Sequence, residues 1–198
     1  MSRDVVIIGC CGANLASLRF ALQRLGVDAP VTEDPERAKR ASHVIMPGVG
    51  AARPAMTRLT EAGFVEAIPT LTQPVLGICL GMQVLFSGSD EERTPCLGVI
   101  DGQVRRLPQS PDLPVPQMGW NQLQLVASSP LLSGVADGAY AYFVHSYAVP
   151  AGPYTCAAAD YGGPFSAVVE QQNFYGTQFH PERSSRVGAR ILANFLRL

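Results

Sequence analysis

Residues 74 to 83 of this chain read PVLGICLGMQ, and this stretch decides the fold. It opens with a short apolar run typical of a buried strand, and a helical pattern follows Cys79. Gly77 lies two positions before Cys79 and Gly81 two positions after it. A sharp turn from strand to helix presents its middle side chain at the end of the strand, and flanking glycines remove Cβ atoms that would clash there. The stretch therefore predicts a nucleophile elbow in an α/β fold.

The alternative for Cys79 is an inert core thiol beside a tight turn, because cysteine is among the most buried residue types. In favour of a reactive thiol, a helix N-terminus after the turn would direct amide N–H groups at the sulfur and stabilise the thiolate. From this motif alone, both interpretations are equally favoured.

The first half of the chain alternates between strand and helix patterns. Apolar runs predict buried strands at 5–8, 29–32, 43–46 and 74–78. Periodicity and capping residues predict helices over 15–25 and 52–62, a short helix from Pro35 capped by Asp34, and a helix from Cys79 through Phe86. Such alternation indicates a mostly parallel sheet with helices on both faces, which is a three-layer α/β sandwich.

The second half favours hairpins over crossovers, because its strand-like runs are separated mostly by turn residues. These runs are 99–107, 122–126, 140–149, 154–159, 165–170 and 174–179. Residues 87–94 are polar and predict a solvated loop, and the Pro-rich residues 108–116 predict an extended surface loop. Apolar spacing over 184–196 predicts a closing helix. We expect antiparallel strands in this half.

Composition narrows the class of protein. The chain has 198 residues, of which 16% are charged, and a net charge of −1, so it lacks the field that would hold a nucleic-acid backbone or an anionic membrane. Because a domain typically has roughly 150 residues, the length of this chain predicts one domain over 1–198. The run Val5–Ile8 is too short for a secretory signal, and no run nears the ~18 apolar residues of a membrane span. We expect a soluble, cytoplasmic protein.

The cysteines predict neither a metal site nor a disulfide framework. Their number is odd, and none of them form a Cys-x-x-Cys pair: they are Cys10, Cys11, Cys79, Cys96 and Cys156. Free thiols fit a reducing compartment.

A thiolate nucleophile needs a base and a group that orients the base. His180 follows a predicted strand, and Glu182 lies two positions later, on the same side of an extended backbone. The carboxylate would fix the imidazole tautomer and leave the other ring nitrogen for the thiol. His43 lies in an apolar run, which indicates a core or edge residue of a strand. For His145 we expect a structural or substrate-facing role. A chance surface pair is the alternative for His180 and Glu182.

Residues 47 to 50, Pro-Gly-Val-Gly, also follow a predicted strand. A peptide at Val49, flanked by Gly48 and Gly50, can turn its N–H toward a developing oxyanion beside the N–H of Leu80. An ordinary glycine turn explains this segment equally well by itself. The conjunction of a cysteine elbow, a glycine loop and a His-x-Glu pair, all at strand ends, favours cysteine acyl-transfer chemistry.

These residues resemble the class I (triad) glutamine amidotransferases, a family with a flavodoxin-like three-layer fold. The motifs that carry the resemblance are residues 77–83 and His180-Pro181-Glu182, in the family's order. Within the family, four segments are similar to the glutaminase subunits of the histidine-biosynthesis synthase that makes imidazole glycerol phosphate. The segments are 47–50, 118–121, 142–147 and 176–184, and the resemblance covers nearly the whole chain.

The resemblance implies hydrolysis of L-glutamine to glutamate and ammonia. Cys79 would attack the side-chain amide, the oxyanion would rest on N–H groups at Val49 and Leu80, and His180, oriented by Glu182, would transfer the protons. Substrate groups would be held by Gly48, Gly50, Gln83 and the backbone of Ser146 and Tyr147. The family needs no metal or organic cofactor.

The resemblance also implies a partner, a (β/α)8-barrel cyclase that uses the ammonia in a heterodimer. Its expected contacts are Met118, Trp120 and Asn14. Local packing is the alternative for the first two, and a helix-start asparagine for the third. Family members usually carry Asp, then Tyr or Thr, then Gly before the Asn-Leu pair, whereas Gly9 to Ala13 here read GCCGA, so details of this contact differ.

Two other functions stay open. The chain could be a paralogous amidotransferase subunit that feeds ammonia to a different synthase, which the catalytic motifs do not distinguish. It could also be a non-catalytic interaction subunit on the same fold, against which the presence of Cys79, His180 and Glu182 argues.

Overall fold

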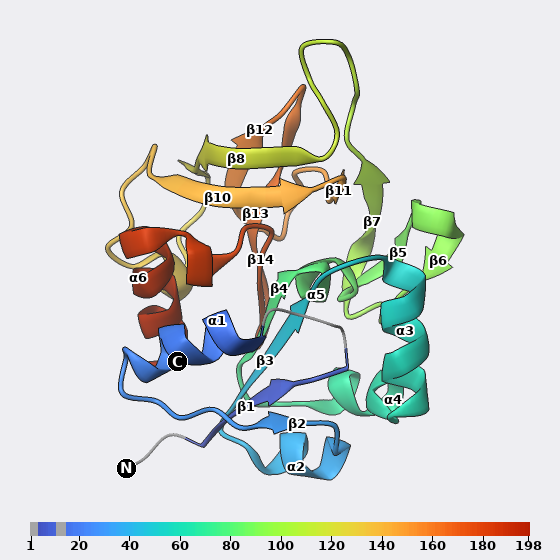
Figure 1. Cartoon of the computed structure of the whole chain (residues 1–198), viewed down its shortest axis with the longest axis vertical. Helices are drawn as coiled ribbons and strands as arrows, with labels where there is room; N and C mark the ends of the chain where they lie inside the picture. The colour runs from blue at the N-terminus through green and yellow to red at the C-terminus, as the bar shows by residue number, and fades with distance from the viewer. Residues whose placement is uncertain (1–3, 11–14) are drawn as a thin grey trace.

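The computed structural model describes residues 4–10 and 15–198. Within them, the strands of the central sheet are β1 (Val5–Ile8), β2 (Val31–Thr32), β3 (His43–Gly48), β4 (Val75–Cys79), β9 (Gln124–Leu125), β12 (Thr155–Asp160), β13 (Pro164–Gln171) and β14 (Phe174–Thr177). Their order is β2-β1-β3-β4-β14-β13-β12-β9 (Figure 1). Strands from β2 to β14 are parallel, and those beyond are antiparallel to their neighbours. The parallel part has the strand order of flavodoxin-like folds, so the predicted fold class is confirmed.

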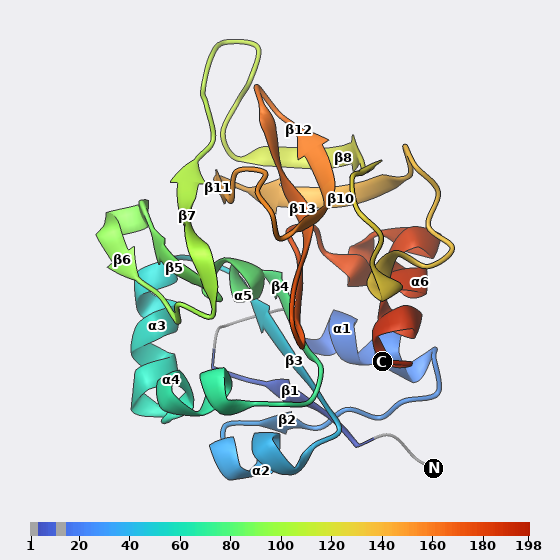
Figure 2. The same ribbon diagram turned by 180° about the vertical axis from the view of Figure 1, so that it is seen from behind.

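Helices cover both faces of the sheet. They are α1 (Leu15–Gln23), α2 (Pro35–Arg40), α3 (Ala52–Glu61), α4 (Phe64–Ala67), α5 (Leu80–Gln83) and α6 (Ser185–Phe195). In β1, Val5 and Ile7 pack with α1 and α6, whereas Val6 and Ile8 pack with α2, α3 and α4. This alternation follows from the period of two in a strand, and it divides the core into two clusters. Figures 1 and 2 show α1 and α6 on one side of the sheet and α3 and α4 on the other. None of the described helices is long and apolar enough to cross a membrane.

Several local predictions are confirmed. Gly26, with φ of +78°, follows the end of α1. Asp34 caps α2, because its side chain accepts a hydrogen bond of 2.9 Å from the N–H of Glu36. Helix α6 buries Ile191 and Leu192 against the sheet, as the apolar spacing predicts. Burial of each such side chain stabilises the fold by about 2 kcal/mol.

Two smaller sheets lie beside the carboxyl ends of β3 and β4. One has the order β11-β7-β5-β6 and is built from β5 (Phe86–Ser89), β6 (Thr94–Pro95), β7 (Ile100–Arg106) and β11 (Tyr147–Ala148). The other is an antiparallel ribbon of β8 (Gln117–Gln122) and β10 (Tyr140–His145), which lies above β14 and α6 in Figure 1.

The structure corrects the predictions around α5. The helix is a single turn and does not run through Phe86, because that residue is fully buried and begins β5, paired with β7. Residues 87–94 are not one solvated loop: they comprise the end of β5, a 3₁₀ turn and the start of β6, and only Ser87, Asp90, Glu92 and Arg93 are exposed. Ser89 and Thr94 are buried, and the Glu91 carboxylate accepts a hydrogen bond of 2.7 Å from the N–H of Ala52. The polar side chains here make internal hydrogen bonds.

Two strands extend beyond their predicted limits. Strand β3 continues through Pro47 and Gly48, which pair with Ile78 and Cys79 of β4. Strand β8, at residues 117–122, begins five residues before the predicted strand at 122–126, because it pairs along its whole length with β10.

Candidate active site

Cys79 occupies the predicted elbow between β4 and α5. Its φ of 54° and ψ of −112° are unusual for a residue with a Cβ, and they turn the chain sharply from strand to helix. A Cβ on Gly77 would lie 2.7 Å from the backbone nitrogen of Met82, and one on Gly81 would lie 1.8 Å from the carbonyl oxygen of Met46. Only glycine fits at either position, so the two glycines are required by close backbone approach.

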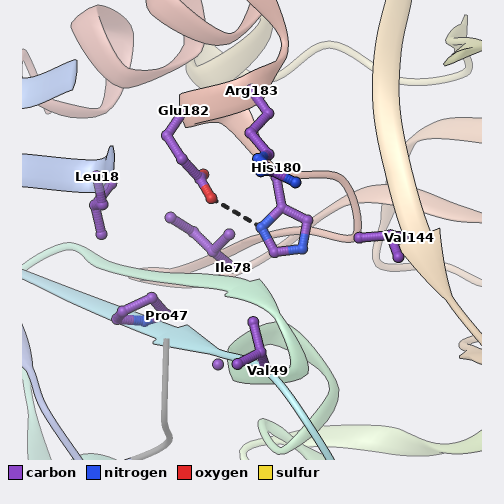
Figure 3. A pocket seen from close by; sticks show the side chains of 9 residues that line it. Leu18, Pro47, Val49, Ile78, Val144, His180, Glu182 and Arg183 are labelled. Atoms are coloured by element: carbon purple, nitrogen blue, oxygen red, sulfur yellow. Dashed lines mark hydrogen bonds and ion pairs between the residues drawn. The ribbon is translucent and has the colours of Figure 1, made fainter. Parts of the chain in front are cut away.

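His180 and Glu182 form a buried pair. The imidazole Nδ1 lies 2.9 Å from the carboxylate Oε1, and the other ring nitrogen points away from the carboxylate (Figure 3). The pair forms, but for a different reason than predicted: the chain is extended only at His180 and then makes a 3₁₀ turn over Pro181–Arg183, which brings the carboxylate back to the ring. The Ser184 hydroxyl donates to the carbonyl of His180 at 2.7 Å and fixes this turn.

The charges around His180 favour an imidazolium. Burial by itself lowers the pKa of His180, but the proximity of Cys79 and the hydrogen bond and negative charge of Glu182 outweigh it and raise the pKa to about 10. A protonated imidazole beside the sulfur stabilises a thiolate. The site therefore has the charge arrangement of a nucleophilic cysteine.

The other described thiols are unsuited to that role. Burial and the nearby Glu91 raise the pKa of Cys96 to about 11, and burial and the nearby Glu170 do the same for Cys156. Burial also raises the pKa of Cys10. Because the thiolate is the reactive form, these three cysteines are poor nucleophiles.

Cys79 and His180 line a cavity of about 390 Å³. Five other residues singled out in the sequence, Val49, Gly50, Gln83, Ser146 and Tyr147, line the same cavity. Gly48 instead lines a second cavity of about 260 Å³, on the Glu182 side of the imidazole (Figure 3). Val49, Val144 and His180 line both cavities, so the two share a wall.

The glycine loop begins directly beside Cys79. Gly48 is the register partner of Cys79, and Val49 follows it with 43% of its surface exposed. Gly50 has a φ of +95°, in the region that favours glycine. Leu80 follows Cys79 as the first residue of α5 and is buried. The two candidate oxyanion donors thus belong to neighbouring segments.

His145 lines the cavity of Cys79, a position that fits the structural or substrate-facing role expected of it. Its Nδ1 lies 2.9 Å from the Tyr147 carbonyl and must carry the proton, because a carbonyl only accepts. Burial and, to a smaller extent, the charge of His180 outweigh the effect of that hydrogen bond and lower the pKa of His145 to about 4. The ring is neutral at pH 7.

Sequence reasoning missed Gln178. Its Nε2 lies 3.7 Å from the sulfur of Cys79, and its Oε1 accepts from Gln83 at 2.9 Å. The signal was its position two residues before His180, which places it on the same side of the chain as the imidazole.

The expected partner contacts lie on the β8–β10 ribbon. Met118 and Trp120 alternate along β8 and are 67% and 53% exposed. The Trp120 ring meets the Tyr142 ring edge-on at 5.9 Å, and the Arg183 guanidinium lies 5.8 Å from the Tyr142 ring centre. A cavity of about 430 Å³ is lined by Trp120, Tyr142 and Arg183. Asn14 lies outside the described residues.

Within residues 4–10 and 15–198, no group of three or more His, Cys, Asp or Glu side chains is arranged to hold a metal ion.

Known proteins resemble the chain over its full length. The sequence model of the family described as glutamine amidotransferase class-I matches residues 10–198. A Xylella fastidiosa protein named imidazole glycerol phosphate synthase subunit HisH is 52% identical over 195 residues, which is 98% of each chain. A Vibrio cholerae protein of the same name is 48% identical over 204 residues, which is 100% of each. A solved structure of a putative GMP synthase subunit from Thermoplasma acidophilum shares the fold, with a TM-score of 0.77. It is 18% identical in sequence, and the match covers 100% of this chain and 94% of that one.

Proposed function

The chain belongs to the class-I glutamine amidotransferase family, and on that premise we propose that it is the glutaminase subunit of an imidazole glycerol phosphate synthase. It hydrolyses L-glutamine to glutamate and ammonia and passes the ammonia to a (β/α)8-barrel cyclase subunit in the cytoplasm. The observation that carries the proposal is that the Cys79 elbow and His180 line one cavity while Glu182 is hydrogen-bonded to the imidazole, in a chain about half identical to full-length relatives of that name.

The reaction has two steps at Cys79. The thiolate attacks the side-chain amide carbon of glutamine, the C–N bond breaks, and the imidazolium of His180 gives its proton to the departing ammonia. A γ-glutamyl thioester remains. The now neutral His180 takes a proton from water, the hydroxide cleaves the thioester, and glutamate leaves as the thiolate is restored. Glu182 holds the imidazole through Nδ1 in both steps.

Substrate binding uses the residues around the cavity. Both N–H groups of the Gln83 amide are used within the protein, at Tyr147 and Gln178, so its Oε1 is left to accept from the α-ammonium of glutamine. The backbone of Ser146 and Tyr147 holds the α-carboxylate. The oxyanion rests on the N–H groups of Val49 and Leu80, and Gly48 and Gly50 give the Val49 peptide freedom to turn.

The cavities support delivery of ammonia to a partner on the β8–β10 ribbon. The cavity of Cys79 shares Val144 and His180 with the second cavity, and the second shares Arg183 with the cavity beside Trp120. This succession extends from the cavity of the sulfur to the exposed side chain of Trp120. A cyclase seated there would receive ammonia at the end of the path. The whole chain, 1–198, serves as one glutaminase domain.

The test is complementation of a histidine auxotroph that lacks this subunit, together with glutamate release by the purified chain. We expect growth to be restored by the wild type and not by Cys79→Ala. We also expect slow glutamate release by the isolated chain and strong activation by the cyclase with its ligand bound, because the Val49 peptide can gate the oxyanion site. Active glutamine hydrolysis without complementation would instead assign the chain to a different synthase.

A further inference from the structure

We propose that Gln178 is a positioning residue of the glutaminase reaction, whose side-chain amide joins Cys79 and Gln83 in one buried hydrogen-bonded network. The inference rests on the proposed function and adds a residue to it. Gln178 is fully buried, on the segment that follows β14, and its backbone N–H donates to the carbonyl of Ala167 at 2.9 Å. Its side chain therefore projects from a fixed backbone.

The network has one consistent direction of donation. The Tyr147 carbonyl only accepts, so Gln83 presents its NH₂ group there, at 2.7 Å. The same NH₂ group donates to Gln178 Oε1 at 2.9 Å. The nitrogen of Gln178 must then face the other way, toward the Cys79 sulfur at 3.7 Å. The orientation of both amides is thus fixed by a carbonyl at one end.

That carbonyl is itself held in place. Tyr147 accepts a second hydrogen bond from Nδ1 of the neutral His145 at 2.9 Å. The network therefore runs from His145 through Tyr147, Gln83 and Gln178 to the sulfur, and it connects the segment proposed to hold the glutamine α-carboxylate with the nucleophile. Nε2 of His145 is buried without a hydrogen-bond partner, so the part of the network whose hydrogen bonds fix one another runs from the Tyr147 carbonyl to the sulfur.

Donation to the sulfur has a chemical consequence. The Cys79 thiol can donate to the Val144 carbonyl at 3.9 Å, which the thiolate cannot do. The N–H of Gln178 offers a hydrogen bond that the thiolate accepts best, and a hydrogen bond to the charged form favours that form. Gln178 thus holds the sulfur in its cavity and stabilises its reactive state, while it orients Gln83 toward substrate.

The experiment measures the rate of Cys79 alkylation by iodoacetamide against pH, with the modified peptide quantified by mass spectrometry. Gln178→Met keeps the length of the side chain and removes both hydrogen-bonding groups. We expect the pH of half-maximal alkylation to rise by about one unit. Gln178→Glu keeps the acceptor for Gln83 and places a carboxyl oxygen at the sulfur, so it should raise that pH at least as far while leaving KM for glutamine closer to wild type than Gln178→Met does.

Asn194→Leu is the matched control. Asn194 lies on α6 and is also buried. Its side-chain amide donates to the carbonyls of Leu131 and Ser133 at 2.9 and 2.7 Å. Its loss should lower thermal stability without moving the alkylation profile. The inference is overturned if Gln178→Met or Gln178→Glu, whichever folds, alkylates with the wild-type profile. Failure of wild-type glutamate release would instead overturn the proposed function, since alkylation does not require turnover.

Discussion

Gly48 and Cys79 are register partners at the ends of the parallel strands β3 and β4. A Cβ on Gly48 would lie 2.7 Å from the backbone nitrogen of Gly81, in the first turn of α5. The glycine loop and the elbow therefore touch through backbone alone. This contact sets how far the Val49 peptide lies from the sulfur, and any side chain inserted between the two segments must separate them.

Gly81→Ala should destabilise the fold by about 3 kcal/mol or more, because its Cβ would lie 1.8 Å from the carbonyl oxygen of Met46, within a rigid strand. Gly26→Ala is the control: Gly26 has a φ of +78° in the turn after α1, but nothing lies within 4 Å of the position its Cβ would take. There we expect a cost of only about 1 kcal/mol. Urea denaturation measures both. Equal losses of stability would show that backbone contact does not explain Gly81.

Cys79→Ala should lower the rate of glutamate release at least about a thousandfold, because the proposed reaction passes through a thioester. Cys10→Ala and Cys156→Ala should retain the wild-type rate, since burial raises the pKa of both thiols and neither lines the cavity of Cys79. A coupled glutamate assay in the presence of the cyclase compares the three variants. Retained activity in Cys79→Ala would contradict the role of the elbow.

Much of the fold follows from local sequence pattern. Strand β4 and the glycines around Cys79 were predictable, because an apolar run and a steric requirement each act over a few residues. The ends of elements were less so. Helix α5 stops after one turn because Phe86 is drawn into a strand with β7, and that pairing partner lies outside any local window.

The site shows the same division. His180 and Glu182 are close in sequence, so their pairing was predictable even though a 3₁₀ turn, rather than an extended chain, brings them together. Gln178 and Gln83 meet although they lie 95 residues apart in the chain. Their contact depends on β14 lying next to β4, which the sequence pattern alone did not specify.

His145 should make the protein less stable in acid. Burial lowers its pKa from 6.5 to about 4, so between these values the unfolded chain binds a proton that the folded chain does not. Stability then falls as the pH decreases through this window, by about 3 kcal/mol from this residue. His145→Asn keeps a donor for the Tyr147 carbonyl without titrating, and its free energy of unfolding should fall less between pH 6.5 and 4. Parallel curves for the two proteins would contradict the shift.

His180 should act in the opposite window. Its pKa rises from 6.5 to about 10, so the folded chain binds the extra proton between these values, and the stabilisation is lost as the pH increases through them. Glu182→Gln removes one of the charges that hold this proton. We expect the His180 ring, followed by NMR, to titrate at lower pH in that variant. An unchanged titration would show that Glu182 does not contribute to the charge of the ring.

Trp120→Ala should weaken binding of the cyclase subunit by about thirtyfold or more, because exposed aromatic side chains at the centre of an interface carry much of its binding energy. The ring is 53% exposed and stacks edge-on against Tyr142, so its truncation should leave the fold intact. Val31→Ala, on the edge strand β2 of the central sheet and 39% exposed, should bind normally. Titration calorimetry with the purified cyclase compares the variants with wild type. Normal affinity of Trp120→Ala would place the partner on another face of the molecule.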